Sequence, residues 1–496
     1  MTFIDILIFI IYLAGTVIYG SSFHRKNKTS SSYTLGDKRI PAWVISMSIF
    51  ATFVSSISYL ALPGQAFISN WNPFVFSLSL PFASWMAARF FVPLYRSVNS
   101  PSAYTYLEQR FGGWAKIYAS AMYLLTQLMR SGTILFLLAL TLNIFLGWNM
   151  AAIIAVTGIC VMIYVLLGGI QAVIWTDAIQ GIILISGAVV AALMLMFSMP
   201  DGPSQLFRIA AENDKFSLGS FSSDVRGSTF WVVLFYGIFI NLQNFGIDQN
   251  YVQRYMTASS DSEAKKSAAW GGLMYIPVSF IFLFIGTSLF CFYSTHPGVL
   301  PEGLQSDRVF PYYIINNMPF GFKGLLIASI FAAGMSTIST SVNSSATVIL
   351  NDYFKKSKNK ENASMKILYA STALFSGLSI VIAIAMINVQ SVLDAWWKLA
   401  SVFSGGMLGL FLLGYFSKKV SSAGAITGVI AGVLVIAWMS LSPVLFKGDL
   451  QKFASPFHSY LTIVFGTTVI FVVGFLCGII FAPPQPSPNG EGDSHK

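Results

Sequence analysis

Long uncharged apolar stretches constrain this chain more than any other feature of its sequence. Each stretch is about 20 residues long, the length that a helix needs to cross about 30 Å of hydrocarbon. Of the 496 residues, 55% are hydrophobic and only 10% are charged, whereas soluble proteins carry about 25% charged residues. In lipid, backbone polar groups must pair within their own segment, so these stretches are predicted to be helices. The sequence therefore predicts an all-α integral membrane protein.

Hydropathy divides the chain into about thirteen predicted spans. We expect them near residues 3–20, 43–66, 74–97, 117–145, 149–168, 174–198, 229–252, 269–293, 320–350, 366–388, 394–416, 421–442 and 458–481. The long connectors 199–228 and 294–319 have room for short helices but not for a soluble domain. Residues 1–482 form the predicted transmembrane domain, and the polar, proline-rich segment 483–496 is predicted to be a disordered tail.

Basic residues are unevenly divided between the two sides of these spans. One set of connectors holds most of them, including Lys116, Arg254 and the clusters at 24–28, 355–360 and 418–419. Cytoplasmic connectors are enriched in Lys and Arg, so this side is predicted to be cytoplasmic. We therefore expect a plasma (inner) membrane protein with its N-terminus outside and its C-terminal tail in the cytoplasm.

Other function classes are disfavoured by composition and motifs. The net charge of +10 comes from basic residues beside apolar spans, which indicates membrane orientation and no nucleic-acid partner. The three cysteines fit neither metal nor disulfide spacing. The histidines are scattered without a His-Glu-x-x-His pair, so a membrane enzyme is disfavoured. The expected partners are the lipid bilayer and a small solute, and no protein partner is evident.

The second predicted span has polar residues in its middle. Hydroxyls lie at Ser55, Ser56 and Ser58, and a Pro63-Gly64 pair follows them. A helix that unwinds around residues 51–56 would free carbonyl oxygens for a cation and present a helix N-terminus that favours anions. The alternative is that the small serines simply let neighbouring helices approach closely.

The seventh span contains an unusual run of amides around a glycine. Asn241, Gln243 and Asn244 precede Gly246, and Asp248 follows it. We predict a second discontinuous helix here, five spans after the first, as an inverted five-helix repeat requires. A polar cytoplasmic helix end is the alternative.

The ninth span carries a face of hydroxyl groups. Ser336, Thr337, Ser339 and Thr340 recur at helical spacing after Ala333, so several of them share one side of a helix. Hard oxygens gathered in this way suit Na⁺. Alternatively, these hydroxyls bond back to carbonyls of their own helix.

Charged residues inside predicted spans need partners, because an unpaired charge is costly in lipid. Arg130 lies deep in the fourth span, and its partner is either a carboxylate solute or a structural acid elsewhere in the bundle. Asp177 lies near the start of the sixth span, where it either completes a cation site or caps its own helix. Further charges in or near predicted spans are Arg89, Asp394 and Lys398.

Several motifs together resemble the sodium:solute symporter family. They are the stretch from Gly168 to Gln180, the Val252-Gln-Arg-Tyr255 run with the later Ala264-Lys-Lys266, the stretch Phe331–Thr337 with Asn343-Ser344, and the Asn351-Asp-Tyr353 run. This resemblance implies a LeuT-type fold. Such a fold has an extra N-terminal helix, two inverted five-helix repeats (about 43–198 and 229–416 here) and two extra C-terminal helices.

Within that family the chain is most similar to bacterial sodium/sialic acid symporters. This resemblance implies a main Na⁺ site at Ala51, Val54, Ala333, Ser336 and Thr337, and a possible second Na⁺ site at Asp177, Ser339 and Thr340. It also implies a substrate site at Ser55, Ser56, Ser58, Ser77, Arg130 and Asn241. Phe53 and Ser77 stand where a threonine and a glutamine are expected, which leaves the exact solute open.

The resulting functional expectation is Na⁺-coupled uptake of a small acidic solute by alternating access, with sialic acid (N-acetylneuraminate) as the first candidate. A neutral sugar, an amino acid or a pantothenate-like solute is the alternative within transport. A sodium-responsive membrane sensor is the alternative from another class.

Overall fold

Helices alone build the part of the chain that the structure describes. This computed structural model describes residues 2–354, 360–388 and 406–480. The β-structure in these ranges amounts to one isolated bridge between Ile40 and Ala258. The expected tail at 483–496, most of the expected span at 394–416, and Asp394 and Lys398 lie outside the described residues.

The helices follow one another closely along the chain. Up to residue 111 they are α1 (Phe3–Ser21), η1 (Ser22–Arg25), α2 (Ser30–Leu35), α3 (Ala42–Phe53), α4 (Ser56–Ile68), α5 (Phe74–Leu78), α6 (Leu80–Met86), η2 (Ala87–Phe91), α7 (Val92–Val98) and α8 (Thr105–Phe111). Next come α9 (Gly113–Leu146), α10 (Met150–Phe197), α11 (Pro203–Glu212), α12 (Phe230–Ile247), α13 (Gln249–Thr257), α14 (Asp261–Leu273), α15 (Tyr275–Thr295) and α16 (Ser306–Asn317). The rest are α17 (Phe322–Val348), η3 (Ile349–Tyr353), α18 (Glu361–Ala385), η5 (Met386–Asn388), α20 (Met407–Phe416), α21 (Ser422–Leu445), η6 (Gly448–Phe453) and α22 (Leu461–Ile480).

Ten helical segments of the described ranges are long and apolar enough to cross a membrane, or eleven if α3 and α4 form one bent span. The predicted number was about thirteen. One reason for the difference is α10, whose 48 residues cover two predicted spans and turn at Gly169, where φ is 56°. The other is α20, whose described part has only 10 residues. The multi-pass, all-helical class is confirmed in these ranges.

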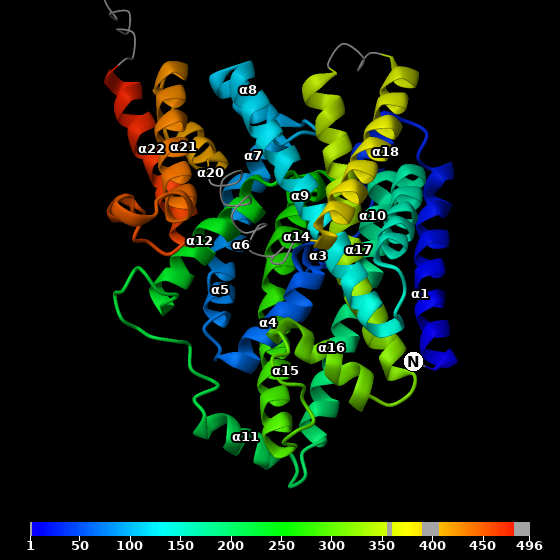
Figure 1. Ribbon diagram of the computed structural model, residues 1–496. Coiled ribbons are helices and arrows are strands. Elements are labelled where there is room, and N and C mark those ends of the chain that lie inside the picture. Colours follow the sequence, from blue (N-terminus) through cyan, green and yellow to red (C-terminus); the bar gives the residue numbers. More distant parts are fainter. Residues whose placement is uncertain (1, 355–359, 389–405, 481–496) are drawn as a thin grey trace, which may run out of the picture.

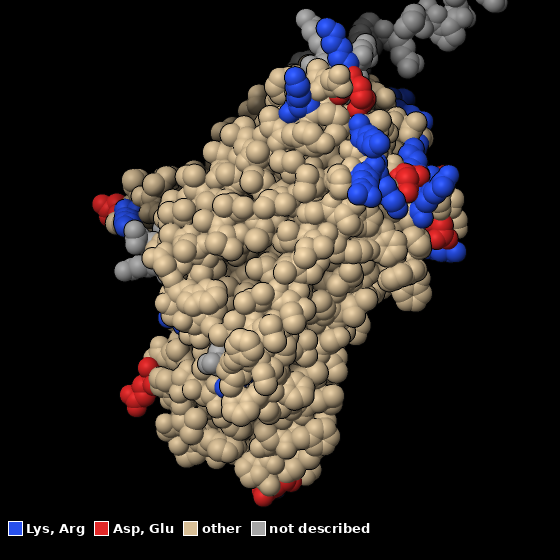
Figure 2. All heavy atoms as spheres, turned by 90° about the vertical axis from the view of Figure 1, so that its right-hand side faces the viewer, with Lys and Arg blue, Asp and Glu red and all other residues tan. Residues whose placement is uncertain are grey.

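α17 lies at the centre of the bundle and contacts α1, α3, α9, α10 and α18. From Leu326 to Val348 every one of its side chains is buried. α1 lies along one flank of the molecule, and α21 and α22 lie along the opposite flank (Figure 1). The flank that bears α1 is free of charge along its middle, and Lys and Arg gather at one end of it (Figure 2). An uncharged belt with a basic rim is the pattern that a bilayer requires.

Short helices fill the two long connectors, as their sequences allowed. α11 lies in the connector at 199–228 and α16 in the one at 294–319. Just after α11, the buried Lys215 Nζ donates to the carbonyl oxygens of Ala66 (3.4 Å), Phe67 (2.7 Å) and Ser69 (2.9 Å). These carbonyls end α4, where the helix dipole is negative. The Nζ atom also lies 3.8 Å from the centre of the Phe290 ring. The connector is thereby fastened to one half of the bent span.

Candidate functional site

The bent span breaks at two residues in the middle of the bundle. α3 ends at Phe53, and Val54 and Ser55 are extended, with ψ of 118° and 170°. α4 then leaves at 59° to α3. The predicted unwinding at 51–56 is therefore confirmed. The last carbonyls of α3 and the first N–H groups of α4 lack partners within their helices, so the break offers acceptors and donors at one place.

Two hydroxyls of α17 meet the end of α3. Ser336 Oγ donates to the carbonyl oxygens of Ala51 (2.8 Å) and Ala333 (3.1 Å). Thr337 Oγ1 lies 3.2 Å from the Ala333 oxygen and 3.4 Å from the Thr52 oxygen. The structure thus brings together four of the five residues expected at the main cation site. Both hydroxyls also bond back within α17, so the alternative explanation holds as well.

These oxygens suit a small hard cation. They are neutral, and their residues are buried. The C-terminal end of α3 adds a partial negative charge. The fifth expected residue, Val54, lies in the break itself, where its N–H donates to the Phe50 oxygen at 3.0 Å and closes the last turn of α3. Its carbonyl therefore belongs to an extended residue beside the site.

Asp177 joins the expected hydroxyls but also has a charged partner. Its Oδ1 atom accepts from Ser339 Oγ at 3.2 Å. Its Oδ2 atom accepts from Ser48 Oγ (2.9 Å) and Thr340 Oγ1 (3.3 Å) and lies 2.6 Å from Arg254 Nη2. Asp177 lies inside α10, so the helix-cap alternative is wrong. A guanidinium already occupies one side of the predicted second cation site.

Two basic residues that were counted among the cytoplasmic connectors have buried side chains. Arg254 lies on α13 with a fully buried side chain that donates to Ser48 Oγ (2.7 Å), Thr340 Oγ1 (2.5 Å) and the Asn250 oxygen (2.6 Å). The side chain of Lys116 is 3% exposed, and its Nζ atom lies 3.1 Å from Asp352 Oδ1. Long basic side chains reach inward past the apparent end of a span, which hydropathy does not show.

The second expected helix break lies at Asp248. α12 runs unbroken through Asn241 and Gly246 to Ile247, so the predicted discontinuity lies near the end of the polar run. Asp248 is extended with ψ of 126°, and its Oδ1 atom accepts from the Asn250 N–H at 2.8 Å. All nine residues of α13 are buried, so this segment is not an exposed polar helix end.

Arg130 reaches the first break from α9. The half-buried side chain places Nη2 3.4 Å from the Thr52 oxygen, at the end of α3. Asp248 is close enough for electrostatic attraction to Arg130. Gln127 links the second break to α17, because its Nε2 donates to Asp248 Oδ2 at 3.2 Å and its Oε1 accepts from Ser341 Oγ at 2.8 Å.

Asp248 and Gln127 were not expected at the site. The sequence signal for Asp248 was present, because a mid-span arginine requires a carboxylate and Asp248 is an acid within the second polar run.

The serines expected to contact substrate are divided between two places. Ser55 and Ser56 are buried at the start of α4, and Ser58 follows half-buried. The Ser56 hydroxyl has no hydrogen-bond partner among the described residues. Ser77 instead donates to Ser279 Oγ at 2.8 Å, on the side of α5 and α15.

Asn241 also belongs to the second place. Its Nδ2 donates to Ser79 Oγ at 2.9 Å. Phe53 packs nearby against Tyr275, with ring centres 4.7 Å apart, and against Phe76. In the described ranges no hydrogen bond connects Ser77 or Asn241 with Arg130 or with the serines of α4.

Comparison with known proteins agrees with this geometry. The model of the sodium:solute symporter family matches residues 33–432. The sodium/sialic acid symporter NanT of Aliivibrio fischeri is 32% identical over 95% of this chain and 92% of its own length. The sodium/sialic acid symporter SiaT of Proteus mirabilis is 31% identical over 97% of this chain and 96% of its own length.

A solved structure of a Na⁺-coupled sialic acid symporter, substrate-bound and outward-open, superimposes with a TM-score of 0.88. It is 29% identical and covers 97% of this chain and 99% of its own. With a broken span, a hydroxyl-lined helix and a matched family model on the same residues, the chain belongs to the sodium:solute symporter family.

Proposed function

We propose that this protein is a Na⁺-coupled symporter that takes up sialic acid (N-acetylneuraminate). The observation that carries the proposal is the meeting of three features at one helix break: the Ala51 carbonyl, the Ser336 hydroxyl and the Arg130 guanidinium. A cation site and an anion-binding group at the same break can be coupled through the same two half-helices. The relatives named above support sialic acid as the solute.

The main Na⁺ site comprises the carbonyl oxygens of Ala51, Val54 and Ala333 with the hydroxyls of Ser336 and Thr337. Sodium entry would turn the hydroxyl hydrogens away from these carbonyls and place the cation among the oxygens. The hydrogen bonds between α17 and α3 would then be replaced by stronger ion contacts. Sodium therefore fixes the end of α3 against α17.

The substrate carboxylate binds between Arg130 and the start of α4. A guanidinium matches a carboxylate with two parallel hydrogen bonds. Ser55, Ser56 and Ser58 supply hydroxyls there, and the positive end of the α4 dipole favours the negative charge. Ser77 and Asn241 belong to the far wall, beyond the aromatic cluster of Phe53, and contact the rest of the solute.

The finer architecture is part of the same proposal. The protein has about thirteen spans in a LeuT-type arrangement, with inverted repeats at about 43–198 and 229–416. The transmembrane domain is 1–482, and 483–496 is a cytoplasmic tail. The N-terminus lies outside an inner (plasma) membrane. Breaks in α3/α4 and at Asp248 fall at corresponding positions of the two repeats, which supports this assignment.

Coupling follows from linkage. Sodium steadies the broken span in the form that binds solute, so each ligand tightens the other by the same factor. Such couplings amount to about 1–3 kcal/mol. The inward sodium gradient then drives uptake as the two repeats rock past each other.

Cation binding at the second proposed Na⁺ site must compete with an existing ion pair. Asp177, Ser339 and Thr340 offer suitable oxygens, but Arg254 already balances the charge of Asp177. A cation therefore fills this site from the Oδ1 side, beside Ser339, or after the guanidinium has moved away from Asp177.

Purified protein in liposomes provides the direct test of function. We expect an inward Na⁺ gradient to drive uptake of labelled N-acetylneuraminate, and a K⁺ gradient of the same size to drive none. Excess unlabelled N-acetylneuraminate should compete, while proline, glucose and pantothenate should not. Competition by one of these three solutes alone would replace the proposed substrate and retain sodium coupling.

Ser336→Ala tests the main Na⁺ site. The variant lacks one of the cation's oxygens, so the Na⁺ concentration for half-maximal uptake should rise at least about fivefold. Ser329→Ala is the matched control, because this buried hydroxyl of the same helix donates to the oxygens of Ile183 and Leu325, away from the proposed site. An unchanged sodium response in Ser336→Ala would remove the hydroxyl from the site.

Arg130 variants test the carboxylate site. Arg130→Ala should abolish uptake, and Arg130→Lys should weaken solute binding about tenfold, because a lysine cannot form the bidentate contact. Arg89→Lys, at an exposed arginine over Phe90, is the control. If an Arg130 variant melts at a lower temperature but binds solute normally, Arg130 is a structural partner of Asp248 and does not bind the solute.

The buried Asp177–Arg254 pair predicts strong coupling between two substitutions. Asp177→Asn or Arg254→Gln alone leaves one buried charge unpaired, at a cost of about 3–5 kcal/mol. The double variant should be less destabilised than the sum of the two, as measured by thermal unfolding in detergent. Glu263 and Lys266, an exposed pair 3.3 Å apart, should give nearly additive effects. Additive losses at Asp177 and Arg254 would contradict the ion pair.

A further inference from the structure

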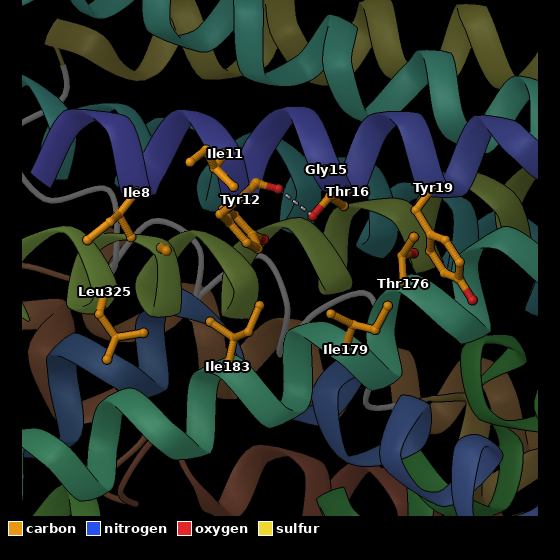
Figure 3. A pocket seen from close by; sticks show the side chains of 11 residues that line it. Ile8, Ile11, Tyr12, Gly15, Thr16, Tyr19, Thr176, Ile179, Ile183 and Leu325 are labelled. Carbon is orange, nitrogen blue, oxygen red and sulfur yellow. Dashed lines mark hydrogen bonds between the residues drawn. The ribbon is translucent and has the colours of Figure 1, made fainter. Parts of the chain in front are cut away.

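A groove of about 350 Å³ runs along α1 on the flank of the molecule, away from the broken span. Its walls come from three helices, α1, α10 and α17 (Figure 3). The residues that line it are Ile8, Ile11, Tyr12, Gly15, Thr16, Tyr19, Thr176, Ile179, Ile183, Leu325 and Ala328. The groove follows α1 from Ile8 to Tyr19, which is three turns of helix.

The groove offers an apolar surface in spite of the hydroxyls of Tyr12, Thr16 and Thr176. Thr16 Oγ1 donates to the Tyr12 oxygen at 2.9 Å, the bond drawn in Figure 3. Thr176 Oγ1 donates to the Ala172 oxygen at 2.8 Å. The Tyr12 hydroxyl contacts Met335 Sδ at 3.7 Å and accepts from Gln180 at 3.2 Å. Because these polar atoms are already bonded within the protein, a polar ligand gains nothing from them.

The open side of the groove faces the bilayer. Ile11 is 62% exposed and Ile179 is 40% exposed, and both lie on membrane-spanning segments. The surroundings there are hydrocarbon tails, so the natural occupant is a hydrocarbon chain. Gly15 leaves room for it, since a Cβ at this position would meet no atom within 4 Å.

One end of the groove leads to a group of basic residues. η1 begins three residues after Tyr19, and Arg25, Lys26 and Lys28 at its end and just beyond are exposed. None of these three has a carboxylate within ion-pair distance among the described residues. Figure 2 shows Lys and Arg gathered at one end of this flank. A phosphate at the membrane surface would find positive charge there.

We propose that this groove binds one acyl chain of an anionic glycerophospholipid, whose headgroup phosphate is held by Arg25, Lys26 and Lys28. The apolar walls select a chain, and the basic end selects the charge of the headgroup. Basic residues next to a membrane attract anionic lipids in this way. The proposal does not depend on which solute is transported.

The groove also adjoins the proposed sodium sites through its walls. Thr176 precedes Asp177, and Tyr12 contacts Met335, which precedes Ser336. A bound chain would therefore hold α1 against the two helices that carry the cation oxygens. We expect lipid binding to raise the thermal stability of the protein as well.

Native mass spectrometry of the purified full chain tests the proposal. The protein in detergent is mixed with phosphatidylglycerol or with phosphatidylcholine of the same acyl chains. We expect one phosphatidylglycerol to be retained, about tenfold more tightly than phosphatidylcholine, with a higher melting temperature. Equal retention of the two lipids, or a melting temperature that neither lipid changes, would overturn the proposal.

Two variants separate the chain site from the headgroup site. Gly15→Leu fills the groove and should lose the retained lipid, while Ile18→Phe, at a residue 70% exposed on the same helix outside the groove, should keep it. Arg25→Gln with Lys26→Gln should keep a lipid but lose the preference for phosphatidylglycerol. Lys418→Gln with Lys419→Gln, on another exposed basic pair, is the matched control.

Two results with Gly15→Leu would overturn the lipid proposal. If Gly15→Leu retains phosphatidylglycerol as the unmodified protein does, the groove is not the site. If the unmodified protein forms a dimer that Gly15→Leu dissolves, a second copy of the chain covers the groove and the lipid proposal fails. The surface variants give an answer even if Gly15→Leu fails to fold.

Discussion

Every backbone polar group inside a membrane must find a partner within the protein, and the broken span is where this requirement is hardest to meet. α3 and α4 end and begin in the middle of the bundle, so their terminal carbonyls and N–H groups cannot turn to water. Ser336 and Thr337 of α17 cover the carbonyls of Ala51 and Thr52. These hydrogen bonds give partners to two carbonyl oxygens that the break leaves without one inside α3.

This requirement explains why α17 is buried on every side. A helix that must satisfy the end of α3 and also contact α1, α9, α10 and α18 has no face left for lipid. Its density of small hydroxyl residues lets these neighbours approach closely. Asp177 and Arg254 add a second constraint, because their charges hold α10 and α13 together across α17. Gln127 adds a bond between α17 and the second break, because it contacts both Ser341 and Asp248.

Local features of the site were predictable from sequence, and long-range pairings were not. The break at Val54 and Ser55 and the hydroxyl face of α17 follow from polar residues inside apolar runs, which hydropathy and helical spacing reveal. The contact of Arg254 with Asp177 joins residues 77 positions apart. No local pattern encodes it, and a positive charge near the end of a span suggests orientation first. The second break, at Asp248, lies within the polar run that predicted it.

The connection between two predicted spans shows a similar limit. Hydropathy separates two spans between residues 149 and 198, and the chain turns between them at Gly169 without a connector. A Cβ at Gly169 would come within 2.9 Å of the Tyr33 carbonyl oxygen, so only glycine fits this turn against α2. Composition shows the apolar length on either side, but the close approach that permits a turn without a loop is a property of the packed structure.

Lys215 couples the surface connector to any movement of α4. Its ammonium group joins three carbonyls at the end of α4, so the connector and that half-helix form one mechanical unit. Movement of α4 about the break must carry the connector with it or release three hydrogen bonds at once. A spectroscopic label on the exposed Asp214, next to Lys215, would therefore travel with the end of α4 and report its position.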